Sequence, residues 1–288
     1  MNKKEGKPIT VIYTPYSPIR QPFLMIKEMW VDLLASFYLA WRLAARDIAA
    51  QYRQTALGYL WAVLPPVFTT IIWVALNSSQ IVNVADTVVP YPVFAFTGTI
   101  LWQIFLDSLN APLKQMNLNR AMLTKINHPK EAIIISGLIQ VLVSLLIKLV
   151  ILVIVLVVFM VEINGLLSIG VILPVVGLIM LGTLFGLFLM PIGLLYKDIQ
   201  EGIPIFSVIF MYLAPVVYTI PAEGAIRKLF ILNPLTPLIQ LARGFLYGDV
   251  SDYLYPALIV IGGSILFLFL GWIVYRLALP LLVERMEA

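Results

Sequence analysis

The stretch RDIAAQYRQTALGYLWAVLPP, residues 46–66, decides how the chain is organised. It begins with a charged segment that carries Arg46 and Arg53, and it passes through Gly58 into an apolar run that begins at Leu60. This order predicts a junction at which a helix on the cytosolic side of a membrane continues, without a loop, into the first membrane span. An ordinary basic flank before a first span is the alternative interpretation.

The composition of the whole chain is that of an integral membrane protein. Of the 288 residues, 61% are hydrophobic and 12% are charged, whereas soluble domains average about 45–50% apolar and about 25% charged residues. The sequence has no cysteine and a single histidine, His128, which excludes disulfides, thiolate metal sites and a histidine cluster within one chain. It also lacks the GxxxxGK[ST] phosphate-binding loop, so we expect no ATP hydrolysis by that route.

Upstream of the junction, residues 23–55 predict an amphipathic helix, and residues 1–22 predict a cytosolic tail without a cleavable signal peptide. At about 100° per residue, charged side chains that include Lys27, Asp32 and Arg46 gather on one side of this helix, and tryptophan, leucine and phenylalanine side chains occupy the other. That pattern is typical of a helix that lies in the membrane interface. A poor transmembrane helix with its charges toward a pore is the alternative.

Six apolar segments downstream predict membrane spans, because a span needs about 20 predominantly apolar residues. We expect the spans at residues 56–76, 92–113, 131–161, 168–195, 202–220 and 253–279. Residues 225–246 contain two shorter apolar pieces separated by NPLTP, which predict helices that enter the outer leaflet and turn back.

The predicted fold class is therefore an all-α integral membrane protein. Residues 56–280 form its six-helix transmembrane domain, and residues 281–288 form a cytosolic C-terminus. In this topology most lysines and arginines lie on the side of both termini, which the positive-inside rule assigns to the cytosol.

Prolines and glycines within the spans carry further predictions. Pro65 and Pro66 are expected in the middle of the first span, where lost hydrogen bonds and ring clashes bend a helix. Gly177, Gly182 and Gly186 lie in the fourth span and predict close packing against a neighbouring helix.

Two ionisable residues, Asp107 and Lys148, are expected inside the spans. Because unpaired charges are costly there, they either pair with each other or line a conduit. Aromatic side chains are frequent on the first and fifth spans, and their flat faces suit stacking on sugar rings as well as ordinary helix packing. These candidate channel residues are Trp61, Phe68, Trp73, Phe206, Phe210, Tyr212 and Tyr218.

Together with this topology, three motifs make the chain resemble the permease subunits of polysaccharide-exporting ABC transporters, a family that includes exporters of O-antigen, teichoic acid and capsular chains. The most specific motif is Arg46, Tyr52 and Arg53 followed by LGYLW at residues 57–61 and by Pro65. The other two are LLYKDIQ at residues 194–200 and NPLTPLIQLARGFLYG at residues 233–248. The resemblance covers nearly the whole chain.

The resemblance implies a half-transporter in the bacterial inner membrane. Two copies would form a channel for a lipid-linked polysaccharide, and two copies of a separate nucleotide-binding subunit would bind ATP and magnesium; no nucleic acid is implied. The amphipathic helix and the inner loop around residues 117–128 would receive the motion of that subunit. The implied coupling residues are Arg46, Arg53, Arg120, Lys125 and His128. The implied outer gate contains Ala225, Asn233, Pro234 and Arg243.

O-antigen is the leading substrate hypothesis, but teichoic-acid and capsule exporters share the same pattern. An exporter of small molecules or drugs with a related architecture is a further alternative. A membrane-embedded glycosyl or phosphoryl transferase would need a pair of metal-binding carboxylates at one membrane face. The spacing of Asp107, Glu131 and Asp198 supplies no recognisable pair.

Overall fold

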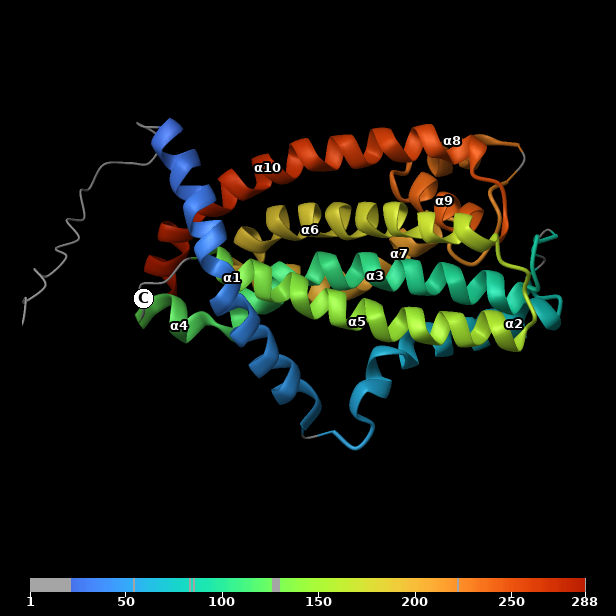
Figure 1. Cartoon of the computed structure of the whole chain (residues 1–288), viewed down its shortest axis with the longest axis horizontal. Helices are drawn as coiled ribbons and strands as arrows, with labels where there is room; N and C mark the ends of the chain where they lie inside the picture. The colour runs from blue at the N-terminus through green and yellow to red at the C-terminus, as the bar shows by residue number, and fades with distance from the viewer. Residues whose placement is uncertain are drawn as a thin grey trace, which may run out of the picture.

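A computed structural model describes residues 22–53, 55–82, 84, 86–125, 130–221 and 223–287, and within these ranges every regular element is a helix. The helices are α1 (Pro22–Arg53), η2 (Gly58–Ala62), α2 (Leu64–Ser78), α3 (Tyr91–Leu118), α4 (Arg120–Lys125), α5 (Glu131–Val158), η3 (Gly165–Val171), α6 (Ile172–Leu195), α7 (Lys197–Tyr212), α8 (Ala225–Leu232), α9 (Leu235–Tyr247) and α10 (Ser251–Glu287). The long helices α3, α5, α6 and α10 form a bundle, and α1 crosses one end of it beside α4 (Figure 1). We call this the α1 end, and the opposite end, which carries α8 and α9, the α8 end.

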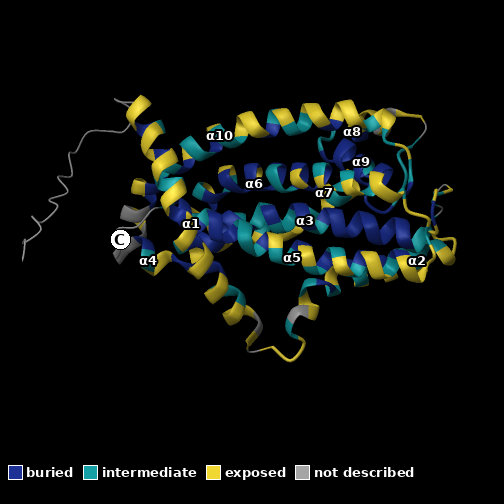
Figure 2. Cartoon of the chain, in the orientation of Figure 1, coloured by how far each residue is buried: buried dark blue, intermediate teal, exposed yellow. Residues whose placement is uncertain are grey.

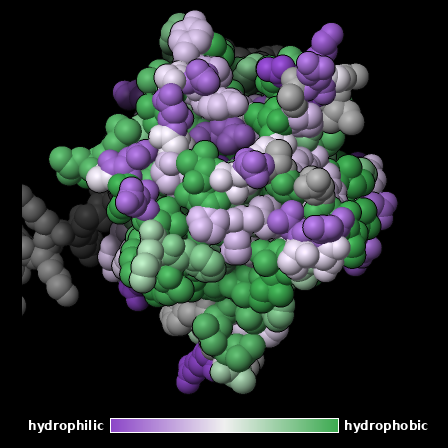
Figure 3. All heavy atoms as spheres, turned by 90° about the vertical axis from the view of Figure 1, so that its right-hand side faces the viewer, coloured by the Kyte–Doolittle hydropathy of each residue, from purple (hydrophilic) through white to green (hydrophobic). Residues whose placement is uncertain are grey.

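Among the described residues, four helical segments are long and apolar enough to cross a membrane, so the chain is a multi-pass membrane protein. They are Tyr91–Leu118, Glu131–Val158, Gly165–Leu195 and Ser251–Leu282. They match four of the six predicted spans, whereas the first and fifth correspond to the shorter helices α2 and α7. Figure 3 looks onto the α8 end, where hydrophilic side chains form several patches and hydrophobic ones dominate the lower part of the view.

The first predicted span differs from the structure in two respects. α1 and α2 are separated by a short segment and by η2, and Gly58, the first residue of η2, has a φ of +50°, a left-handed conformation that glycine adopts without strain. Pro65 and Pro66 lie in the first turn of α2 and not in the middle of a helix. Because the first N–H groups of a helix have no intrahelical acceptor, prolines there start the helix and do not bend it.

The fifth predicted span and the C-terminus also differ. α7 already begins at Lys197, between the predicted fourth and fifth spans, and ends at Tyr212. The chain that follows is not helical, and its backbone carbonyls at Leu213 and Pro215 accept hydrogen bonds from α8–α9 side chains. α10 continues to Glu287, beyond the predicted sixth span, and the cytosolic position of residues 281–288 stays a prediction.

α3 lies at the centre of the bundle and is buried over much of its length (Figure 2). The prediction of close packing at the glycines of α6 is confirmed. A Cβ added to Gly182 would lie 2.5 Å from the carbonyl oxygen of Phe105, and one added to Gly186 would meet the carbonyl of Leu109. α6 therefore packs with its backbone directly on that of α3, whereas Gly177 meets side chains of α9 and α10.

α1 is a single helix with three distinct faces, where the sequence separated only two. One face, which includes Met29, Ala40 and Ala44, is buried against the bundle. A second face exposes apolar side chains such as Leu34 and Trp41, and the charged residues form the third. The exposed apolar face suits a membrane interface, and the position of α1 in that interface stays a prediction.

Candidate coupling and transport surfaces

A chain of side-chain hydrogen bonds joins α1 to the base of α4. The Arg46 guanidinium donates to Asp47, at 2.8 Å, and to Oδ1 of Asn119, at 2.7 Å. Asn119 follows α3 and directly precedes α4. The buried amide of Asn119 donates to two oxygens of Gln115, the backbone carbonyl at 3.0 Å and the side-chain Oε1 at 3.2 Å. Ser136 of α5 donates to the same Oε1, at 3.2 Å. Side chains of α1, α3 and α5 thus meet where α4 begins.

Apolar packing strengthens the same junction. Leu123 of α4 belongs to a buried cluster with Ala40 and Leu43 of α1 and with Leu279 and Leu282 of α10. α4 thus packs against α10 and shares one buried apolar cluster with α1.

Arg276 of α10 makes a second polar link at the α1 end. Its guanidinium donates to Oδ2 of Asp32 on α1, at 2.6 Å, and to Oε1 of the buried Glu131 on α5, at 2.8 Å. The neighbouring Tyr275 hydroxyl donates to the carbonyl of Lys130, at 2.7 Å. Burial is the main cause that lowers the pKa of the Lys130 ammonium, and the positive charge of the nearby Arg276 lowers it further.

The structure brings one of the predicted coupling residues, Arg46, into the α1–α4 junction. Arg53 is exposed in the last turn of α1, and Arg120 is exposed at the start of α4. His128 lies outside the described residues, and Lys125 is placed only as the last residue of α4. Asn119 was not singled out from the sequence, although an amide four residues after Gln115 at the end of an apolar helix could have pointed to it.

The predicted channel residues fall into two groups. Trp73 of α2 lies 6.0 Å from Tyr212 and 6.2 Å from Tyr218, measured between ring centroids, and Tyr218 lies 5.7 Å from Phe230 of α8. The Tyr218 hydroxyl also donates to the carbonyl of Tyr212. Aromatic pairs at this separation attract one another. The rings of Trp73, Tyr212 and Tyr218, all predicted channel residues, therefore connect α2 to the end of α7 and the segment after it.

The second group of predicted channel residues is exposed. Trp61 lies on η2, Phe68 on α2, and Phe206 and Phe210 on α7, and each exposes more than half of its surface. α7 buries none of its residues and α2 buries only Pro66 and Thr70. These two helices therefore leave most of their apolar surface uncovered within a single chain.

At the α8 end, Arg243 of α9 is buried inside the protein. Its guanidinium donates to the carbonyls of Pro215, at 2.7 Å, Val216, at 2.6 Å, and Phe94, at 3.0 Å. The guanidinium carbon lies 3.6 Å from the centroid of the Phe94 ring, a cation–π contact. Arg243 therefore fixes the non-helical segment after α7 onto α3 and α9.

The other predicted gate residues lie at the ends of α8 and α9. The Asn233 side chain donates to the carbonyl of Leu213, at 2.7 Å. Pro234 occupies the N-cap of α9, and Ala225 begins α8. Their movement as a gate stays a prediction.

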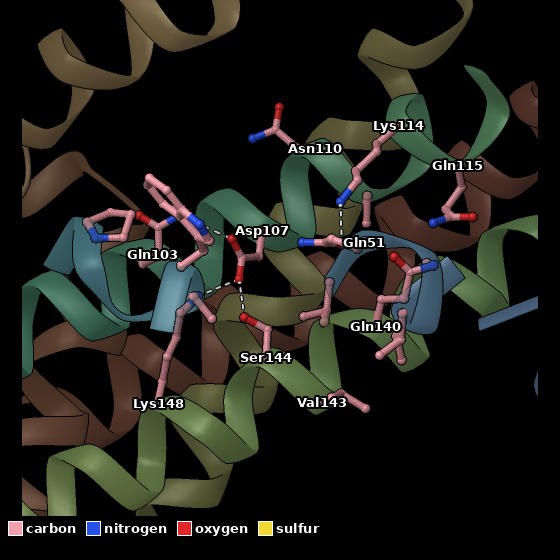
Figure 4. Close-up of a pocket in the computed structure, with 17 residues that line it drawn as sticks. Gln51, Gln103, Asp107, Asn110, Lys114, Gln115, Gln140, Val143, Ser144 and Lys148 are labelled. Atoms are coloured by element: carbon pink, nitrogen blue, oxygen red, sulfur yellow. Dashed lines mark hydrogen bonds and ion pairs between the residues drawn. The ribbon is translucent and has the colours of Figure 1, made fainter. Parts of the chain in front are cut away.

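A cavity of about 260 Å³, which we call the polar cavity after its charged and amide side chains, is lined by the last turns of α1, by η2 and Pro65 of α2, and by α3 and α5 (Figure 4). On its wall, Lys148 Nζ lies 2.5 Å from Oδ2 of Asp107, so the two intramembrane charges pair with each other. Asp107 also accepts hydrogen bonds from Ser144, at 2.8 Å, and Gln103, at 3.1 Å. These donors stabilise the carboxylate within a helix long and apolar enough to span a membrane, where an unpaired charge is costly.

Residues 38–247 match the family described as ABC-2 type transporter. Because this match covers more than half of the chain, the protein belongs to that family. The matched region begins within α1, contains α4 and the polar cavity, and ends at the last residue of α9.

Among individual proteins, the chain is similar to the O-antigen export system permease protein RfbA of Myxococcus xanthus. The two are 25% identical over 221 residues, which cover 71% of this chain and 78% of that protein. A protein of the same name from Klebsiella pneumoniae is 22% identical over 228 residues, which cover 77% of this chain and 85% of that protein.

Proposed function

We propose that the chain is the channel-forming membrane subunit of an ATP-driven exporter of lipid-linked polysaccharide, with O-antigen as its glycan. The ABC-2 type family and the two relatives named as O-antigen export permeases support this proposal. Teichoic-acid and capsular chains are the alternative cargoes, because the motifs in this chain are common to all three kinds of exporter.

In the proposed topology, α2 and α7 join the four long helices to make six membrane spans. The α1 end faces the cytosol of a bacterial inner membrane, and α8 and α9 enter the outer leaflet as a gate. The predominance of lysine and arginine on the α1 side supports this orientation.

The observation that carries the proposal is the bond between Arg46 of α1 and Asn119 at the base of α4. Two nucleotide-binding subunits, which hold ATP and magnesium, would dock on α1 and α4 of two copies of this chain. Because Asn119 is also bonded to Gln115 of α3, a push on either docking helix reaches the centre of the bundle.

The exposed faces of α2 and α7 would meet a second copy of the chain and line the conduit. An uncovered apolar surface of this kind is typical of a binding or assembly surface. The exposed rings of Phe68, Phe206 and Phe210 are suited to stacking on sugar rings that move through the conduit.

The test uses proteoliposomes that contain this chain alone or together with its nucleotide-binding subunit. We expect the chain alone to hydrolyse no ATP and the complex to do so, with stimulation by lipid-linked O-antigen. Arg120→Glu should abolish the stimulation, because it reverses a charge on α4, whereas Lys228→Glu on the exposed surface of α8 should leave it unchanged. ATP hydrolysis by the isolated chain, or stimulation by drugs and not by glycan, would overturn the proposal.

A further inference from the structure

We propose that the polar cavity between α1, η2, α3 and α5 binds the phosphate headgroup of a lipid. The cavity extends from the middle of α3 and α5, at Asp107 and Lys148, to their ends beside α1, at Lys114 and Gly137. A lipid headgroup could therefore enter the cavity from the α1 end, where we place the cytosolic surface of the membrane.

The cavity has both polar and apolar walls, and it is large enough to hold an occupant. A molecule of liquid water occupies about 30 Å³, and the cavity has a volume of about 260 Å³. Five of its lining side chains are amides: Gln51, Gln103, Asn110, Gln115 and Gln140. Because polar groups within a bilayer need hydrogen-bond partners, an occupant with several polar atoms is favoured over an apolar one.

The charges of the cavity favour an anion. Asp107 and Lys148 compensate each other, and Asp107 is the only acidic residue among the described residues that line the cavity. Lys114, at the exposed rim, donates to Oε1 of Gln51, at 3.2 Å, and forms no ion pair within the described part of the chain. The lining thus has one excess positive charge, at Lys114. Gln103, Asn110 and Gln140 each donate once to a protein acceptor, for Gln140 the carboxylate of Asp47 beside the cavity. Because an amide carries two N–H donors, donors remain for the acceptor oxygens of a phosphate.

The surroundings of the cavity favour a lipid over a free phosphate ion. Trp61 lines the cavity and is 54% exposed, and Leu57 and Leu60 beside it are also exposed. Figure 1 shows α1 and α2 diverging from the bundle on the same side. Leu57 is the N-cap of η2, and Leu60 and Trp61 lie within η2, between these two helices. An amphiphile could place its headgroup on the polar wall and its chains along this apolar connection.

Two kinds of lipid carry this headgroup chemistry. One is a glycerophospholipid of the bilayer, and the other is the phosphate-bearing lipid carrier of a glycan. In the second case the inference rests on the proposed function, and the cavity would be a first contact site for the substrate.

The experiment measures lipid binding by native mass spectrometry on the delipidated full chain in detergent. The probes are phosphatidylglycerol, a polyprenyl phosphate and diacylglycerol, which has no phosphate. We expect the phosphate lipids to bind and diacylglycerol not to bind. Lys114→Gln should weaken binding about tenfold, the effect of losing one charge-assisted hydrogen bond. Ala62→Phe should weaken it by filling the cavity without changing its charge, and Lys228→Gln, at the α8 end, should have no effect.

The two sources give different supporting results. Binding of polyprenyl phosphate alone identifies the glycan carrier, whereas binding of phosphatidylglycerol, with or without the other, identifies bilayer lipid. Equal binding of diacylglycerol, or unchanged binding in both Lys114→Gln and Ala62→Phe, would overturn the inference. Either result leaves ATP-driven export untouched, because binding is measured without ATP and without the partner subunit.

Discussion

The two ends of the bundle are both held by arginines, but in different ways. At the α1 end, Arg46 and Arg276 bind side chains of other helices, and the Arg46 side chain is 55% exposed. At the α8 end, Arg243 is 3% exposed and binds three backbone carbonyls. The Asn164 side chain makes the same kind of bond there, to the carbonyls of Gly244 and Gly248.

This difference indicates which end is built to move. The partly exposed ion pairs of Arg46 with Asp47 and of Arg276 with Asp32 contribute only about 0–1 kcal/mol each, so they can be exchanged at low cost even though Glu131 stays buried. A buried arginine on backbone carbonyls holds main-chain segments in one arrangement, because each carbonyl loses its partner when the arginine leaves. We infer that the α1 end works as a joint and that the core of the α8 end works as a fixed support.

The largest effect is expected for Arg243→Met. The substitution removes the cation–π contact with Phe94 and leaves buried carbonyls without donors, which should lower the free energy of unfolding by about 3 kcal/mol or more. Thermal melting of the purified chain checks this, with Arg243→Lys as an intermediate case because one ammonium cannot reach all three carbonyls. If Arg243→Met melts at the same temperature as the parent protein, the α8 end is not the more rigidly held end of the bundle.

A smaller effect on stability is expected for Asn119→Ala. Loss of the hydrogen bonds to Arg46 and Gln115 should lower the free energy of unfolding by about 1–2 kcal/mol. The rate of export by the complex should fall by more than this loss of stability explains. The matched control is Asn117→Ala, an exposed asparagine at the same helix end. If both variants export equally well, the bond does not serve coupling.

The smallest effect is expected for Asp32→Asn. This change weakens one of the ion pairs of Arg276 but keeps its bond to Glu131, so the cost should stay below about 1 kcal/mol and shrink further at high salt. Melting curves at two salt concentrations measure it, with Glu28→Gln as the control, because Glu28 lies 3.8 Å from the same guanidinium. A large, salt-independent loss would show that the α1 end is as rigid as the α8 end.

Periodicity and composition predicted the parts of the fold that depend on local pattern. The long apolar runs gave α3, α5, α6 and α10, and the small residues Gly182 and Gly186 gave the close contact of α6 with α3. Because isolated charges are costly in a membrane, pairing of Asp107 with Lys148 was one of two predictions, and the structure shows the pair.

The contacts that depend on tertiary packing could not be read from the sequence. Arg46 and Asn119 are far apart along the chain, so their bond follows only from the way α1 crosses the bundle. The burial of Arg243 was missed because its acceptors are backbone carbonyls, which no residue type marks. Pro65 was misplaced because a proline pair inside an apolar run fits both a bend and a helix start.

The central claim is that the bond between Arg46 and Asn119 transmits ATP hydrolysis to export, and a double-mutant cycle tests it most directly. The measurement is the amount of ATP hydrolysed per glycan exported by the reconstituted complex with Arg46→Ala, Asn119→Ala or both. We predict that each single variant raises this ratio and that the double variant raises it no further, because both remove the same bond. An unchanged ratio in the single variants, or effects that add in the double variant, would contradict the claim.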